Sequence, residues 1–333
     1  MKNKKAFDIP FGNLFAIIAG VAILILAIYA TTQLIVPSAK YSQYSEAAAQ
    51  LSNYLNPIVN GISSAYSSKI SFGKNTRIYL TCSTWGQYSP IFGKQTIAFA
   101  EESSILKKWT EPGAEISRYN KYVFSENVSE GKKYYIFSKP FYAGFRVDDL
   151  VMTTFSNYCF VAAPANIEEE IQGLAMENIN FTTNVKNCKT NQVNVCFGFT
   201  ATECDVAVLG QCDGSLCKHE YDRGYVKKGD ESMYYYGSLI YAAIYSSPDI
   251  YECNVKRLGK KIAELGKVYQ GKIEVVKTKN CDSLVGNNLD LIIPLAQKIN
   301  SSAQMLRIQE YAKEMDENNC KSLCKIYPEG EDC

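Results

Sequence analysis

The chain of 333 residues is long enough to bury the core of one large or two medium domains. Hydrophobic residues make up 47% of it and charged residues 21%, with 24 Tyr and 15 Phe, which excludes a mainly disordered chain. Because the formal net charge is only +1, the composition gives no support to a nucleic-acid partner.

The N-terminal segment has the composition of a membrane anchor. Residues 9–39 contain no charged side chain, and residues 14–36 are almost all aliphatic. As a helix, that stretch extends about 34 Å, enough to cross a hydrocarbon core of about 30 Å. Lysines precede it within the basic segment 1–13, so the positive-inside rule places that segment in the cytoplasm and the later chain outside. The sequence therefore predicts a single-pass signal anchor in the cell membrane, contacting the lipid bilayer through residues 14–36.

Two alternatives for this segment stay open, and both also export the later chain. Residues 28–30 offer a small-residue cleavage site for a signal peptide, although the apolar run continues beyond them. Residues 4–7 resemble the leader junction of type IV prepilins, which implies an apolar helix that assembles into a filament. The chain departs from that pattern, because Asp8 and Pro10 interrupt the helix start and Phe11 stands where the prepilin glutamate is expected.

Residues 37–69 are predicted to form a helical stalk. Apolar or aromatic residues recur at spacings of three and four from Tyr41 to Ile62, which places them on one helical stripe. Asn56 and Pro57 combine a cap residue with proline at a first helical position, so a break is expected there. The stripe either pairs with a second copy, giving a homo-oligomer, or lies against its own domain.

From about residue 70 the periodicity becomes alternating, and we predict an extracytoplasmic α+β domain over 70–333. Short runs rich in β-branched and aromatic residues predict an antiparallel-rich sheet, with one helix over 166–176. The predicted strands cover residues 77–81, 96–100, 122–124, 134–137, 150–161, 193–199 and 206–209.

Helices are predicted to dominate the C-terminal part. Residues 247–249 form a helix start, with a cap residue, a proline in the first turn and an acid near the positive helix end. A further strand is predicted over 273–277, and one or two helices over 289–315. The fold class is thus α+β, with an anchor and stalk followed by a sheet domain and C-terminal helices.

All twelve cysteines lie after residue 81, on the side predicted to be outside the cell. Disulfides persist outside the reducing cytoplasm, so export and the even count predict structural disulfides. From Cys188 to Cys212 four cysteines recur every eight residues, which would bring them close on the strands of a meander, but their pairing is not assignable. The candidates are Cys82, Cys159, Cys188, Cys196, Cys204, Cys212, Cys217, Cys253, Cys281, Cys320, Cys324 and Cys333.

Other uses of the cysteines have less support. The sequence has no C-x-x-C motif, which would bring two thiolates onto one turn for zinc or provide a redox pair, so neither metal nor cofactor is predicted. Cys320 and Cys324 are predicted on one helix face, each bridging another element, with Cys281 and Cys333 as candidate partners. The alternative zinc ligand set is Cys204, Cys212, Cys217 and His219.

No catalytic residue is assignable, because the sequence has no G-x-S-x-G, P-loop or G-x-G-x-x-G motif. His219 is the only histidine, and its charged neighbours predict an exposed turn. Acids at 168–170 are predicted to be solvated in a helix first turn, and tyrosines at 234–236 to form a buried junction between sheet and helix. The candidate glycosylation sites are the N-x-[ST] sequons at Asn127, Asn180 and Asn300.

Two stretches carry a resemblance. FDIPFGNLFAIIAGVAILILAIYATTQLI at 7–35 and SLIYAAIYSSPDIYECNVKRL at 238–258 resemble uncharacterised single-pass envelope proteins of small-genome archaea. The resemblance implies a cell-envelope location and no known activity. We therefore expect a membrane-anchored cell-surface protein whose domain binds or assembles with other envelope components. The alternatives are a type IV pilin-like filament subunit and an extracytoplasmic hydrolase, which would need a pocket where carboxylates or His219 converge.

Overall fold

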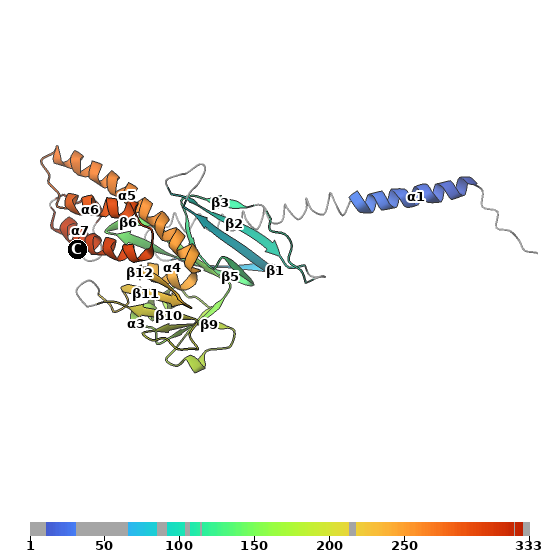
Figure 1. Ribbon diagram of the computed structural model, residues 1–333, viewed down its shortest axis with the longest axis horizontal. Coiled ribbons are helices and arrows are strands. Elements are labelled where there is room, and N and C mark those ends of the chain that lie inside the picture. The colour runs from blue at the N-terminus through green and yellow to red at the C-terminus, as the bar shows by residue number, and fades with distance from the viewer. Residues whose placement is uncertain are drawn as a thin grey trace, which may run out of the picture.

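The computed structural model describes one N-terminal helix and an α+β domain of two six-stranded mixed sheets with helices (Figure 1). Most of the predicted cytoplasmic segment, residues 31–36 of the predicted membrane span and the predicted stalk up to residue 65 lie outside the described residues. The described residues are 11–30, 66–84, 92–103, 107–113, 115–212, 218–322 and 324–328.

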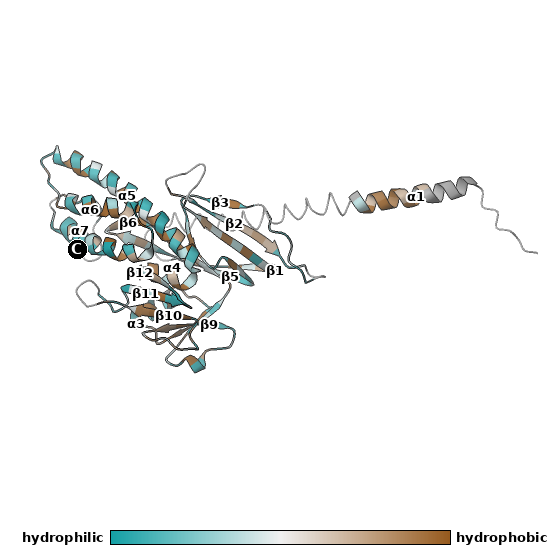
Figure 2. Ribbon diagram, in the orientation of Figure 1, coloured by the Kyte–Doolittle hydropathy of each residue, from teal (hydrophilic) through white to brown (hydrophobic). Residues whose placement is uncertain are grey.

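Helix α1 (Phe11–Ala30) carries most of the predicted membrane span. It lies apart from the two sheets (Figure 1), and its described residues are mostly apolar (Figure 2). Large apolar side chains from Val21 to Tyr29 are exposed, with Ile23 at 66% and Leu26 at 65%. None of the helices in the described part of the chain is both long enough and apolar enough to cross a membrane.

The first sheet has the strand order β3-β2-β1-β5-β6-β4 and curls until its ends meet. Only residues 119–121 separate β3 from β4, and so short a link spans at most about 14 Å. The two outermost strands must therefore be neighbours in space. All neighbouring pairs are antiparallel except β4 with β6. The strands are β1 (Tyr66–Ser83), β2 (Lys94–Glu101), β3 (Ile116–Arg118), β4 (Tyr122–Phe124), β5 (Val128–Ala143) and β6 (Phe145–Thr154).

The second sheet has the order β12-β11-β10-β9-β7-β8. Strands β8, β7, β9 and β10 run parallel, and only β10, β11 and β12 alternate in direction. The expected antiparallel-rich sheet is therefore wrong for this half of the domain, because helix α3 (Ala165–Gly173) crosses from β7 to β8 and long loops join the other parallel strands. The strands are β7 (Asn157–Val161), β8 (Ile179–Thr182), β9 (Gln192–Phe197), β10 (Val206–Gly210), β11 (Arg223–Lys228) and β12 (Glu231–Tyr236).

Helix α4 (Leu239–Tyr245) joins the two sheets into one core. All of its residues are buried, since LIYAAIY is apolar around the whole helix. The ring of Tyr245 packs edge-on against Phe137 of β5, with centroids 5.0 Å apart, and lies 4.5 Å from the ring of Tyr158 of β7. Because those strands belong to different sheets, the helix fixes one sheet against the other.

The C-terminal helices are α5 (Pro248–Lys277), α6 (Gly286–Gln297) and α7 (Met305–Lys321), and they pack side by side (Figure 1). The predicted helix start at 247–249 is confirmed, with Ser247 as N-cap. The predicted strand over 273–277 is wrong, because α5 continues through it. Ile273 and Val276 pack against the core whereas Val275 is exposed, which is the helical period.

Structural disulfides are confirmed. The pairs are Cys82–Cys253, Cys159–Cys188, Cys196–Cys204 and Cys281–Cys324, and Cys212 and Cys320 are also disulfide-bonded. No cysteine among the described residues is a free thiol. Because disulfides persist outside the reducing cytoplasm, this set indicates an extracytoplasmic domain.

The structure contradicts three predictions about the cysteines: the zinc ligand set, the meander and the shared helix face. Cys204 cannot be a zinc ligand, because its sulfur is bonded to Cys196. That pair closes the loop between parallel strands β9 and β10 rather than joining two strands of a meander. Helix α7 ends at Lys321, so Cys320 and Cys324 do not share a helix face; one of the candidate partners, Cys281, is bonded to Cys324. Cys217 and Cys333 lie outside the described residues.

Candidate functional site

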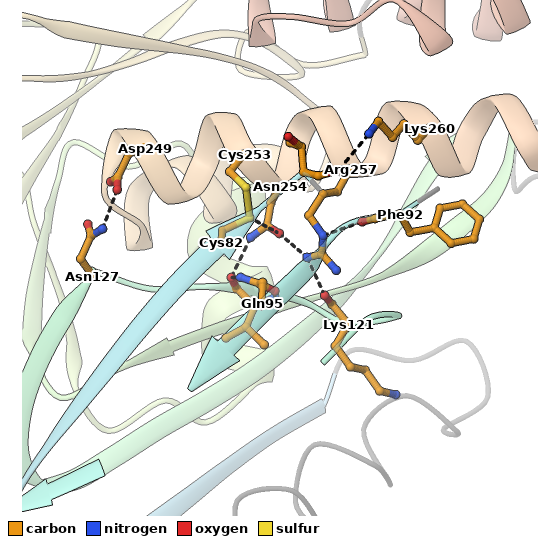
Figure 3. The surroundings of a disulfide bond; sticks show 12 residues. Cys82, Phe92, Gln95, Lys121, Asn127, Asp249, Cys253, Asn254, Arg257 and Lys260 are labelled. Atoms are coloured by element: carbon orange, nitrogen blue, oxygen red, sulfur yellow. Dashed lines mark hydrogen bonds between the residues drawn. A yellow bond between two sulfur atoms is a disulfide. The ribbon is translucent and has the colours of Figure 1, made fainter. Parts of the chain in front are cut away.

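A buried polar seam closes the first sheet where its ends meet (Figure 3). The side-chain amide of Gln95, on β2, serves both backbone groups of Val123 on β4: Nε2 donates to the carbonyl at 2.7 Å, and Oε1 accepts from the N–H at 2.8 Å. Asn254 of α5 donates to the same carbonyl at 2.8 Å. The Gln95 side chain thus takes the place of a neighbouring strand, and together with Asn254 it satisfies the N–H and carbonyl of Val123, which would otherwise be buried without a hydrogen bond.

Arg257 of α5 completes the seam. Its side chain is fully buried and donates to the carbonyls of Phe92 and Lys121 at 2.8 and 2.9 Å and to Asn254 Oδ1 at 2.7 Å (Figure 3). It also donates to the carbonyl of Tyr119 at 2.7 Å. Burial lowers the pKa of Arg257 to about 10. These bonds hold the turn between β3 and β4, so we assign this residue a structural role.

The charged side chains beside the seam are paired with each other. Lys261 of α5 forms an ion pair with Asp148 on β6, and Arg146 forms one with Asp149 at 2.8 Å. Burial is the main cause that lowers the pKa of the neighbouring Lys121. Each of the two carboxylates is neutralised by a cation, which is the arrangement of a structural network.

The two edges of the second sheet differ. At one edge, β12 is covered by side chains that satisfy the backbone of Tyr234. Its N–H donates to Ser302 Oγ at 3.0 Å, and its carbonyl accepts from the Tyr251 hydroxyl at 2.5 Å. Ser302 is in turn held by hydrogen bonds to the carboxylate of Glu252. Side chains from α5 and from the segment before α7 thus protect this edge from pairing with another strand.

At the other edge, β8 has no partner strand beyond β7 in the part of the chain that the structure describes. The carbonyls of Asn178 and Thr182 accept hydrogen bonds from the N–H groups of Tyr158 and Ala162 at 2.7 and 2.8 Å. Backbone groups alternate in direction along a strand, so the even-numbered residues of β8 face β7. The N–H and the carbonyl of Phe181 therefore point away from the sheet, where another strand could pair with them.

A groove of about 560 Å³ lies along this open edge, between α3 and β8. Glu177 at its rim pairs with Lys69 of β1 at 2.7 Å, and this contact lowers the pKa of Glu177. Glu168 accepts a hydrogen bond from Gln172 at 2.9 Å and has no ion-pair partner among the described residues. The groove is lined by Glu168, Ile171, Gln172, Ala175, Met176, Glu177, Ile179, Asn180 and Phe181. It combines a lining of polar and apolar side chains, two carboxylates and a strand edge without a partner strand among the described residues, which suits an extended peptide better than a reacting group.

The predicted site residues lie in separate places. His219 is exposed in a turn and does not line the groove. Its backbone N–H donates to the Asp222 carboxylate at 2.9 Å. Of the sequons, Asn127 is half-buried and donates to Asp249 at 2.5 Å, whereas Asn180 on β8 and Asn300 are exposed. No group of metal-ligating side chains is found in the part of the chain that the structure describes.

The tyrosines at 234–236 and the acids at 168–170 belong to segments where a helix meets a sheet. Tyr235 and Tyr236 are buried at the end of β12, so the predicted junction between sheet and helix is confirmed. The solvated acidic turn is only partly right. Glu169 is exposed, but Glu170 pairs with Lys139 of β5 and accepts from the Tyr241 hydroxyl, because α3 packs beside the first sheet.

Asp316 of α7 makes stability depend on pH. Burial raises the pKa of this carboxyl from 3.8 to about 6, so the fold favours its protonated form. The resulting stabilisation is fully present below pH 3.8 and is lost as the pH rises through about 6. We expect Asp316→Asn to be more stable than the parent at about pH 7 but not at about pH 4, measured as urea midpoints. The exposed Glu314→Gln on the same helix serves as the control, and an equal response of both variants would contradict the assignment.

The groove had no signal in the sequence, because the direction of the Phe181 backbone groups follows only from the pairing of β8 with β7. Comparison with known proteins finds no family model, curated protein or solved structure that matches this chain.

Proposed function

We propose that the protein is a membrane-anchored cell-surface protein whose disulfide-stabilised domain binds other components of the cell envelope. The observation that carries this proposal is the set of disulfides in the domain. They crosslink both sheets and the C-terminal helices, as suits a domain displayed in an oxidising environment.

The anchor is assigned to residues 14–36, with the N-terminus in the cytoplasm and the domain outside. Support comes from the charge-free sequence, the lysines before it, and the exposed apolar side chains of α1 from Val21 to Tyr29. A bilayer would cover those side chains. The predicted stalk is the candidate surface for pairing with a second copy, although its predicted helical end at 66–69 is wrong, because those residues begin β1 by pairing with β5.

The groove between α3 and β8 is proposed as the binding surface of the displayed domain. Covered strand edges are the rule in natural proteins, and β12 of the same sheet follows it. A strand edge that has no partner strand among the described residues, beside a groove, is therefore the feature best suited to a partner.

Mass spectrometry of the full-length protein, purified from its own cells and alkylated without and then with reduction, tests the proposal. We expect the described cysteines to be alkylated only after reduction. Alkylation of all of them without reduction would contradict an extracytoplasmic domain.

N-terminal sequencing of the same sample separates the anchor from the alternatives. We expect the chain to retain Met1 or to begin at Lys2. A mature start at Phe7 would instead identify a pilin-like filament subunit, and a start after Ala30 a cleaved signal peptide.

A further inference from the structure

We propose that the groove between α3 and β8 takes an extended peptide segment that carries a lysine or arginine and adds to β8 as a further strand. This inference rests on the proposed function, because it assigns the partner of the same surface.

The backbone of β8 is prepared for strand addition. The N–H and the carbonyl of Phe181 both point out of the sheet, since the flanking carbonyls of Asn178 and Thr182 face β7. No hydrogen bond to either group of Phe181 is found within the described residues. An added strand would lie about 4.8 Å away and pair with both groups.

The groove offers apolar contacts to such a strand. Its main apolar contact surface is Phe181, which is half-buried and whose ring is fixed edge-on to the Phe160 ring at a centroid distance of 5.7 Å; Ile171, Met176 and Ile179 form the buried floor beneath it. Alternate side chains of an added strand would face α3 and contact this lining. The site is therefore built for a chain with β-branched or apolar residues at every second position.

The charge of the rim selects a basic residue. Glu168 and Glu177 line the groove, and no lysine, arginine or histidine does. Lys69 already neutralises Glu177, which leaves Glu168 as the carboxylate without an ion pair. A second copy that paired β8 with β8 would bring like charges together, so the acidic rim favours a basic peptide over self-association.

Fluorescence anisotropy with the full-length protein in detergent micelles tests this assignment. The probes are labelled peptides of alternating threonine and valine with a central lysine, a central glutamate, or a central lysine and N-methyl groups on alternate backbone nitrogens. We expect the lysine peptide to bind about fivefold more tightly than the glutamate peptide. N-methylation on the edge that faces β8 should abolish binding, because it removes the donors that strand addition needs.

Two variants of α3 provide the matched comparison. Glu168→Gln should abolish the difference in affinity between the lysine and glutamate peptides. Glu169→Gln should leave that difference unchanged, because Glu169 is exposed on the same helix but lies outside the groove. Hydrogen exchange of the Phe181 amide should slow when the lysine peptide binds.

Equal binding of the lysine and glutamate peptides, no binding of either, or unchanged exchange at Phe181 would overturn the inference. These outcomes are independent of the alkylation test. A protein with disulfides that ignores the peptides contradicts the peptide assignment alone, whereas free thiols throughout contradict the proposed function.

Discussion

Replacement of Arg257 by methionine is expected to lower the free energy of unfolding by about 4 kcal/mol. Methionine fills much of the space but donates no hydrogen bond, so the carbonyls of Phe92, Tyr119 and Lys121 lose their partner. The turn that joins β3 to β4 would then be released. Urea unfolding of the full-length protein measures the loss, and faster hydrogen exchange at the Val123 amide would locate it at the seam.

The control for this variant is Lys267→Met on the same helix. Lys267 is exposed and, within the described residues, its ion pair is with Glu264, three residues before it, so its loss should cost about 0.5 kcal/mol or less. Similar urea midpoints for the two variants would contradict the role assigned to the seam.

Removal of the Cys82–Cys253 disulfide, by the double change Cys82→Ala and Cys253→Ala, should have the second large effect. The bond joins residues 171 positions apart. Closing so long a loop lowers the conformational entropy of the unfolded chain, which adds about 5 kcal/mol to the free energy of unfolding. It also ties the end of β1 to α5 beside the seam (Figure 3). We expect a lower urea midpoint for the full-length protein and a steeper slope, because the unfolded chain without the crosslink exposes more surface.

The Cys196–Cys204 pair is the internal comparison. It spans only 8 positions, so its removal should cost about 2.5 kcal/mol by the same loop-entropy relation. If the short-loop variant proves less stable than the long-loop variant, loop closure is not the main contribution of the long-range disulfide.

Helix-start residues and alternating hydrophobic runs correctly predicted several helices and strands, because these signals act between residues close in the chain. The cap residue, proline and acid at 247–249 placed the start of α5 correctly, and the alternating runs located strands such as β2 and β4. The strand expected at 273–277 failed because β-branched residues there continue the helical stripe of Tyr269, so packing outweighed their strand propensity.

Long-range features had no such signal. Gln95 and Asn254 meet at Val123 although they lie far apart in the chain, and nothing local marks them as partners. Oxidised cysteines followed from composition, but their pairs depend on which strands become neighbours. In the candidate site, Glu168 could not be told apart in a run of three acids: Glu170 pairs with Lys139, Glu169 is exposed, and of the three only Glu168 lines the groove.

Labelling of intact cells tests the central claim, display of the domain outside the membrane, most directly. Cells would be treated with a membrane-impermeant phosphine and then with a membrane-impermeant biotin maleimide, and the full-length protein isolated. We predict biotin on cysteines of the domain, such as Cys82 and Cys253, in intact cells and only after reduction. Labelling that appears only after lysis, and without any reductant, would contradict the account.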